Sequence, residues 1–511
     1  MKRNGRSAVL WILYGAAVLC ANLLAALYAA PGDALPWLNA AAGLLAAGAL
    51  ILLLRRSSLW NGAPRSVGLR YYGFCALGCF LGWLPVFLAY WPGLFAYDVV
   101  GQLSQVPGRF TTHHPLAHTL YLKLFDKIGR DWLNCPNAGV ALAALCQMAV
   151  FACMLAFVHW FLARTGVRRG VRLGFLVFTA VCPAVSMLAI ALTKDVFFAG
   201  FFVMTLTCLA CRHAAPEVWK QKWCRALYVC SAAGVVLFRN NGVYCLAAML
   251  AVELLEGLRH RNIRPAAWTA AGLCLGLLLA GGLQAALHAE DGSPNEMLSV
   301  PYQQLACVYQ EHGDELSEQE KEDLLLLLPH AGNYNPLRSD AIKRTGTGAK
   351  HPETLIRLYA KLGMQYPGDY LKAFVRLNAG YLSLTDTTYS RIYGTQNRQG
   401  VLLSDTKEDF GVEHTSLLPG LENLYETLFT ENRYLDMPGL NLLLSPALYF
   451  WLLTALLVGI LAQKQTSSYP MSACAAMLIL TILAGPCALV RYALPYMLCI
   501  PVFAVCVFQK A

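Results

Sequence analysis

Four short polar groups lie at the ends of long apolar runs, and their side chains could together bind and transform a charged substrate. They are Asp98 within 91–102, Lys194 with Asp195, the group Arg239, Asn240 and Asn241, and Arg491 with Tyr492. A carboxylate can act as a general base, whereas arginine and lysine are the side chains that hold phosphate. The combination favours a site for a phosphate-bearing substrate with a base nearby.

Each of these residues also has a plainer structural interpretation. Asp98 could cap a helix or be a solvated loop acid. Lys194 and Asp195 could pair with each other, and an arginine at the end of an apolar helix can extend toward lipid headgroups. An ionisable residue at the end of a membrane span is nevertheless costly to keep, which makes function the default hypothesis for all four groups.

Three histidines follow Asp98 in the same segment. His114 and His118 are four residues apart, a spacing that metal ligands can have, and His113 precedes them. No cysteine or glutamate stands at a fitting distance, so ordinary polar contacts or hydrogen bonds to a substrate are favoured over a metal. The metal is left unknown at this point.

The elements that must position these residues are membrane-spanning helices. The 511-residue chain is 57% hydrophobic and 14% charged, with a mean hydropathy of +0.47, which is too apolar for a soluble protein of this length. Its apolar runs are long enough to cross a hydrocarbon core as helices and lack the period-2 alternation of barrel strands. The sequence predicts an all-α polytopic membrane protein.

We expect about twelve spans. Their ranges are 9–30, 36–54, 72–90, 138–162, 173–192, 196–211, 226–238, 242–257, 266–288, 441–462, 470–489 and 492–508. The two runs on either side of Arg239 are short, and they could form a hairpin that stops below one surface.

The distribution of charge predicts which loops face the cytoplasm. Lysine and arginine gather in alternate loops, at 55–70, 164–172, 212–225 and 259–264, as the positive-inside rule requires. Both termini are then cytoplasmic, and the opposite loops are external: 31–35, 91–137, 193–195, 239–241, 289–440 and 490–491. The chain's net charge of +10 therefore reflects membrane topology rather than a nucleic-acid surface, and we expect a multi-pass protein of the plasma membrane.

The long external segment 289–440 has the composition of a folded domain. It contains 22 of the 30 acidic residues and 13 of the 40 basic ones, a local net charge of −9. Ser317 and Glu320 form a capping box, and 352–364 and 367–384 have helical apolar spacing. We expect three parts: spans one to nine in 1–288 with the first large external loop 91–137, a helix-rich extracytoplasmic domain in 289–440, and the last three spans in 441–511.

Most of the 18 cysteines lie inside apolar runs, where they behave as small hydrophobic residues. Cys208 and Cys211 make a CxxC without a second pair, which gives little reason to expect a metal or redox centre. Cys135 and Cys307 are predicted on the same external side, so a bridge between them is left open.

These motifs resemble the GT-C class of polytopic membrane glycosyltransferases, in particular an uncharacterised bacterial branch. The residues that carry the resemblance are Trp91-Pro92-Gly93 with Tyr97-Asp98 and Gln102, His114-Pro115, Lys194-Asp195, Arg239-Asn240-Asn241-Gly242, Tyr366-Pro367 with Tyr370-Leu371 and Phe374, and Arg491-Tyr492 with Pro495. The resemblance covers most of the chain.

The resemblance implies a reaction and roles for the residues. The sugar donor would be a polyprenyl-phosphate lipid, the acceptor a glycan or lipid of the cell envelope, and the displacement inverting. Asp98 would be the base, and Arg491, Arg239 and Lys194 would hold the lipid phosphate. The other substrate-binding candidates are Tyr97, Gln102, His114, Asp195, Asn241 and Tyr492.

The chain departs from that class at one point. Several members carry paired acids in the first external loop, whereas Val99 and Val100 follow Asp98 here. A divalent metal is therefore unsupported by a motif, unless Asp195 approaches Asp98 and supplies the second carboxylate. The alternatives from other classes are a transporter or flippase of a lipid-linked or anionic substrate, and a non-catalytic scaffold; the charge-free centres of the spans argue against a transporter.

Overall fold

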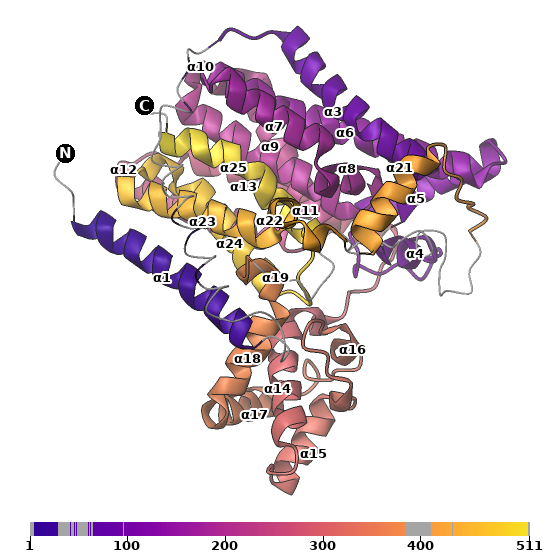
Figure 1. The fold of residues 1–511 in the computed structure, drawn as a ribbon, viewed down its shortest axis with the longest axis vertical. Helices are drawn as coiled ribbons and strands as arrows, with labels where there is room; N and C mark the ends of the chain where they lie inside the picture. Colours follow the sequence, from indigo (N-terminus) through magenta and orange to yellow (C-terminus); the bar gives the residue numbers. More distant parts are fainter. Residues whose placement is uncertain are drawn as a thin grey trace.

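The computed structural model describes residues 5–28, 65–95, 97–384, 410–431 and 433–508, with isolated positions between 41 and 62. Regular structure in these residues is helical, apart from a single sheet of two short strands. Figure 1 shows a broad bundle of long helices and a smaller helical lobe that projects from one side of it. The prediction of an all-α membrane protein is confirmed at this level.

Eight helices of the described residues are long and apolar enough to cross a membrane. They are α1 (Gly5–Leu27), α3 (Leu69–Ala89), α6 (Pro136–Arg164), α9 (Lys194–Ala214), α13 (Arg264–Ala286), α23 (Pro446–Gln463), α24 (Tyr469–Leu483) with the short η7 (Thr466–Ser468) before it, and α25 (Val490–Phe508). A ninth span is counted if α7 (Arg169–Val181) and α8 (Pro183–Ile190), which meet at 47°, cross as one bent unit. The chain is thus a multi-pass membrane protein.

The expectation of twelve spans was wrong for the part of the chain that the structure describes. The predicted span 36–54 lies outside the described residues apart from isolated positions. The runs around Arg239 form α11 (Lys222–Phe238) and α12 (Gly242–His260). By length and composition neither passes as a span, because α11 has only 17 residues and α12 contains three charged ones, Glu253, Glu256 and Arg259. Helix α11 nevertheless packs along α9 and brings Arg239 to Asp195.

The centre of the bundle is formed by α9 and α25, which are buried along most of their length, whereas α1 and α13 lie at its edge and are largely exposed. The core is aromatic and aliphatic, with Trp83, Phe151 and Phe202 among its fully buried side chains. Both central helices begin at the same end of the bundle. Any side chain in their first turns is therefore held by well-packed helices.

A small parallel sheet joins two loops at this end of the bundle. Strand β1 (Leu94–Phe95) follows α3 and pairs with β2 (Ala191–Leu192), which precedes α9, with Leu94 opposite Ala191. Gly93, with φ of +130°, makes the turn into β1, and a side chain there would press against Ala144. Because the strands run in register, the residues that follow them emerge side by side.

The remaining described elements are shorter. They are α4 (Tyr97–Leu103), α5 (Leu116–Lys127), η2 (Ile128–Trp132), α10 (Pro216–Trp219), η3 (Pro294–Leu298), α14 (Ser299–His312), α15 (Glu318–Leu327), η4 (Ala331–Asn333), α16 (Asp340–Lys343), α17 (Pro352–Gln365), α18 (Pro367–Leu377), α19 (Ala379–Leu382), α21 (Pro419–Tyr425), η5 (Glu426–Thr430), η6 (Arg433–Asp436) and α22 (Pro438–Leu444).

The projecting lobe has a hydrophobic core of its own. Helices α14, α15, α17 and α18 surround buried residues that include Tyr302, Leu324 and Leu362. The capping box of Ser317 and Glu320 begins α15 and is confirmed. Helix α17 follows the predicted 352–364, whereas the helix expected over 367–384 ends at Leu377 and resumes as α19.

The second half of 289–440 packs differently from the first. Tyr381, Tyr425 and Phe429 belong to the core of the bundle, and α21 lies against α3. The lobe is therefore the part from α14 to α18, which ends at Leu377, and the later helices pack against the membrane-spanning part.

The bridge left open between Cys135 and Cys307 is not formed. Both are free thiols; Cys135 is exposed and Cys307 is buried.

Candidate functional site

The first turn of α9 supplies two charged side chains. Thr193 caps the helix, because its hydroxyl accepts a hydrogen bond from the backbone nitrogen of Asp195 at 3.3 Å. Asp195 then points into the end of the bundle with 1% of its side chain exposed. The pairing of β1 with β2 brings Asp98, in α4, to the same place.

Asp98 pairs with Lys194 rather than with solvent. The Nζ atom of Lys194 lies 2.7 Å from Oδ2 of Asp98 and 2.9 Å from Nδ1 of His114. The side chains of Asp98 and Lys194 are 18% and 13% exposed, so the pair is largely sheltered from water. The proton-bearing ammonium is thus shared between a carboxylate and an imidazole nitrogen.

Asp195 pairs with an arginine from the opposite side. Nη1 of Arg239, which follows α11, lies 2.6 Å from Oδ1 of Asp195. The guanidinium of Arg239 also stacks over the ring of Tyr492, with its central carbon 4.4 Å from the ring centroid. Such contacts hold the arginine by its planar face and leave its edge to form hydrogen bonds.

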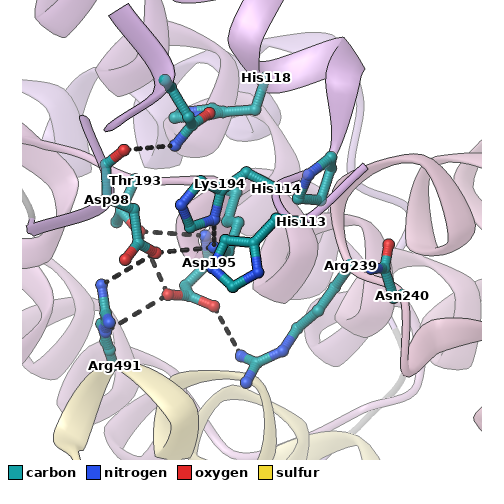
Figure 2. A network of polar contacts seen from close by, with 12 residues as sticks. Asp98, His113, His114, His118, Thr193, Lys194, Asp195, Arg239, Asn240 and Arg491 are labelled. Carbon is teal, nitrogen blue, oxygen red and sulfur yellow. Dashed lines mark hydrogen bonds and ion pairs between the residues drawn. The ribbon is translucent and has the colours of Figure 1, made fainter. Parts of the chain in front are cut away.

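Arg491, in the first turn of α25, faces both carboxylates, with an ion pair to each (Figure 2). Its Nη1 atom is 3.5 Å from Asp98 and its Nε atom is 3.6 Å from Asp195, distances that make ion pairs but not hydrogen bonds. Both nitrogens are buried and make no hydrogen bond with any residue that the structure describes. They are donors that an added anion could satisfy.

The positive and negative charges of the five side chains in this cluster are not equal in number. Lys194, Arg239 and Arg491 carry three positive charges at neutral pH, and Asp98 and Asp195 carry two negative ones. The cluster therefore keeps one excess positive charge in a sheltered place, where charges are poorly screened. An anion fits that surplus better than a neutral ligand.

Burial and the charges of the cluster shift the pKa values of Asp98 and His114, which both lie in the segment 91–137. Burial would raise the pKa of Asp98, but Lys194 and Arg491 outweigh burial and hold that pKa well below its usual range. Burial, followed by the charge of Lys194, lowers the pKa of His114 to about 3. Asp98 is therefore ionised and His114 neutral at physiological pH.

The structure brings together most of the predicted site residues. Asp98, His114, Lys194, Asp195, Arg239, Arg491 and Tyr492 form one network. Lys194 and Asp195 do not pair with each other; each pairs with a residue from another element instead. The interpretation that these two residues pair with each other therefore does not describe them.

Three predicted residues take other positions. Gln102 is fully buried, and its Nε2 atom donates a hydrogen bond to the backbone carbonyl of Asp98 at 3.2 Å. Its side-chain oxygen accepts a hydrogen bond from Thr119 at 3.2 Å and contacts Nδ1 of His118 at 2.8 Å, so Gln102 holds the backbone of Asp98 rather than its carboxylate. Asn241 donates to Thr481 at 2.9 Å. Tyr97 begins α4, but its side chain lies outside the described part of the structure.

Sequence reasoning missed Thr193, whose hydroxyl also lies 3.2 Å from Oδ2 of Asp195. A threonine directly before a charged residue and a long apolar run is a typical helix cap, so this signal was readable. For His118, ordinary polar contacts or hydrogen bonds to a substrate were favoured over a metal. His118 stands behind the site, fully buried, and orients Gln102.

The arrangement also bears on a metal. Among the described residues, no group of three or more histidine, cysteine, aspartate or glutamate side chains is placed to hold a metal ion. Asp195 does approach Asp98, and the guanidinium of Arg491 forms an ion pair with each of them. The two carboxylates therefore already have cationic side chains of the protein itself as their partners.

Comparison with known proteins identifies the family but not the reaction. Neither the curated proteins nor the solved structures contain a match to this chain. The matched family segment begins after Asp98 and includes Lys194, Asp195, Arg239 and Arg491. The chain belongs to DUF6020, a family of unknown function, whose model matches residues 104–511.

Proposed function

We propose that this protein transfers a sugar from a polyprenyl-phosphate donor to an envelope acceptor, in the manner of the GT-C class that its motifs resemble. The observation that carries the proposal is the surplus of one positive charge beside a sheltered carboxylate, with two buried donor nitrogens of Arg491 left without hydrogen bonds. A donor phosphate supplies the missing anion, and Asp98 supplies the base.

The phosphate would bind by entering the existing ion pairs. Nη1 and Nε of Arg491 are the first ligands, because they have hydrogen bonds to gain, and Lys194 is the second. The N-termini of α9 and α25 lie at the same place, and their dipoles also favour an anion. Arg239 remains with Asp195 and Tyr492 and closes the far side.

Donor binding would also make Asp98 a better base. In the unliganded protein Lys194 and Arg491 stabilise its carboxylate, so its pKa lies too low for efficient proton abstraction. An anion that takes up those cations weakens their hold on Asp98 and raises its pKa. The base therefore becomes effective once the donor is in place, which limits reaction in its absence.

The chemical step then follows from these positions. Asp98 accepts the proton of the acceptor hydroxyl as the hydroxyl oxygen attacks the anomeric carbon. The bond between that carbon and the phosphate oxygen breaks, the electron pair leaves with the phosphate, and the configuration at carbon inverts. Arg491 and Lys194 stabilise the negative charge that the departing phosphate gains.

The site is proposed to lie on the outer side of the membrane. The positive-inside pattern puts the site and the lobe on the extracytoplasmic face of the plasma membrane, with both termini in the cytoplasm. A glycan or lipid acceptor would then reach Asp98 from that face, beneath the lobe. Lipid-linked donor, membrane lipids and envelope acceptor are the partners this arrangement requires.

Reconstitution into vesicles with radiolabelled polyprenyl-phosphate sugars tests the proposal directly. We expect transfer of label to an envelope fraction from at least one donor, with release of polyprenyl phosphate. Asp126→Asn provides a matched control, because Asp126 also pairs with an arginine, Arg130, in the same segment but away from the cluster. Movement of labelled lipid across the vesicle without any transfer would support the transporter alternative instead.

A further inference from the structure

The turn between α24 and α25, residues 484–489, is held by residues that come from the lobe and from the segment that follows it. The backbone nitrogen of Ser339 donates to the carbonyl of Pro486 at 2.9 Å. The side-chain nitrogen of Asn378 donates to the carbonyl of Leu483 at 3.1 Å. Both donors are buried, and they fix the start and the middle of the turn.

Tyr381, in α19, fixes the end of the same turn. Its hydroxyl accepts a hydrogen bond from the backbone nitrogen of Leu489 at 2.8 Å. The same hydroxyl can donate to the carbonyl of Leu489 at 3.2 Å or to that of Cys487 at 3.4 Å. Tyr381 is fully buried, so no water replaces these bonds, and they end two residues before Arg491.

Arg491 depends on this turn for its position. The only hydrogen bond of its guanidinium among the described residues is from Nη2 to the hydroxyl of Tyr492, its neighbour in the chain. The ion pairs to Asp98 and Asp195 are 3.5 and 3.6 Å long and tolerate small displacements. The backbone before α25 therefore decides where the guanidinium lies.

We propose that the lobe and α19 set the phosphate affinity of the site by positioning Arg491 through the 484–489 turn, with Tyr381 as the principal positioning residue. This inference rests on the proposed function, because it assumes that Arg491 binds phosphate. It also gives the lobe a role in the donor site: a displacement of the lobe, such as a docked acceptor could produce, reaches Arg491 through Ser339, Asn378 and Tyr381.

The variant Tyr381→Phe tests the inference because it keeps the buried ring and removes only the hydroxyl. The matched control is Tyr302→Phe. Tyr302 is also fully buried, its hydroxyl accepts from the backbone nitrogen of Gly348 at 2.8 Å, and it lies in the core of the lobe. Both variants lose one buried hydroxyl with similar bonds, so a general loss of stability affects them alike.

The measurement is calorimetric binding of farnesyl phosphate to the purified full chain in detergent, with farnesol and inorganic phosphate as further probes. We expect Tyr381→Phe to weaken farnesyl phosphate binding about tenfold, a change that corresponds to the free energy of about one hydrogen bond. Tyr302→Phe should bind as wild type does. Farnesol reports the lipid chain alone and inorganic phosphate the anion alone, so the two sources of affinity are separated.

The variant Arg491→Ala separates this inference from the proposed function. If Arg491→Ala leaves farnesyl phosphate binding unchanged, the phosphate role of the site fails. If Arg491→Ala weakens binding and Tyr381→Phe does not, or if Tyr302→Phe weakens binding equally, the positioning role fails and the phosphate role stands. In the double variant Tyr381→Phe with Arg491→Ala, we expect no loss beyond that of Arg491→Ala alone.

Discussion

At the scale of single residues, the most informative feature is an arginine with more donors than partners. Buried polar groups in proteins are nearly always hydrogen-bonded, because leaving one unsatisfied is costly. Nε and Nη1 of Arg491 are exceptions among the described residues, and both face carboxylates that lie slightly too far away. This arrangement is the basis for the proposal that the site binds an anion.

Arg491→Ala should therefore weaken donor binding more than acceptor binding. The loss of charge-assisted hydrogen bonds to a phosphate corresponds to about 1.5 to 3 kcal/mol, or roughly ten- to a hundred-fold in Kd. Titration with donor and acceptor in turn measures the difference, and Arg130→Ala, which breaks the ion pair with Asp126 outside the cluster, serves as the control. An equal loss of affinity for both ligands would contradict the phosphate role.

The histidine beside Lys194 gives the site a pH dependence with a definite sign. The pKa of His114 is about 3 in the folded protein, against about 6.5 in an unfolded chain. Between these values the unfolded chain binds a proton that the folded one does not, so the free energy of unfolding falls as the pH falls from about 6.5 toward 3. We expect His114→Gln to flatten that slope in thermal unfolding measured at several pH values.

The residues of the site could largely be predicted, but their pairing could not. Ionisable residues at the ends of apolar runs stood out because a membrane makes them costly. Which carboxylate meets which cation depends on the register of β1 with β2 and on the order of α9, α11 and α25 around the centre. The sequence neighbours Lys194 and Asp195 accordingly pair with Asp98 and Arg239.

At the scale of elements, close packing between α3 and α7 depends on a glycine. A β-carbon at Gly82 would lie 2.5 Å from the carbonyl oxygen and 2.8 Å from the β-carbon of Ala180. We expect Gly82→Ala to lower the free energy of unfolding by about 1 to 3 kcal/mol, since the two helices must move apart. Thermal unfolding in detergent measures the change.

Gly78, one turn earlier in α3, is the matched control. A β-carbon there would meet nothing nearer than the Cδ1 atom of Leu176 at 3.7 Å, an ordinary contact. Gly78→Ala should be neutral or stabilise the helix by about 0.5 to 1 kcal/mol, because alanine loses less backbone entropy than glycine. Equal destabilisation by both variants would show that the packing of α3 on α7 is not as described.

Two of the predicted spans are interrupted, and a proline explains each break. The run 173–192 was expected as one helix, but the chain bends by 47° at Cys182 and Pro183. The run 441–462 is likewise divided at Ser445, before Pro446. A proline lacks a backbone donor and restricts the residue before it, so both breaks had a readable signal that hydrophobicity alone concealed.

At the scale of the whole molecule, the described residues of the predicted domain 289–440 form two parts that pack in different places. Its first part forms a lobe with its own core, and its last part packs into the bundle. Helical spacing and capping identified helices α15 and α17 correctly, because those signals are local. The partner of each apolar face is a long-range property, so the contribution of Tyr381 to the 484–489 turn was not predictable.

The positive-inside pattern predicts that the lobe faces out. A protease-cleavage sequence inserted at Gly332, an exposed position in η4, should be cut when protease is added to intact cells, because this face of the membrane is accessible. A cleavage sequence fused to the C-terminus, which the same pattern predicts to be cytoplasmic, should be cut only after permeabilisation. The reverse pattern would place the lobe in the cytoplasm and exclude an envelope acceptor.

The measurement that tests the account most directly compares Asp98→Asn with wild type in the same vesicles, recording both donor binding and sugar transfer. Because the amide cannot accept the proton, we expect transfer to fall by about a hundred- to ten-thousand-fold. Donor binding should persist or tighten, since Lys194 and Arg491 lose a competing carboxylate. Transfer at the wild-type rate by Asp98→Asn would contradict the assignment of the base, and with it the proposed reaction at this site.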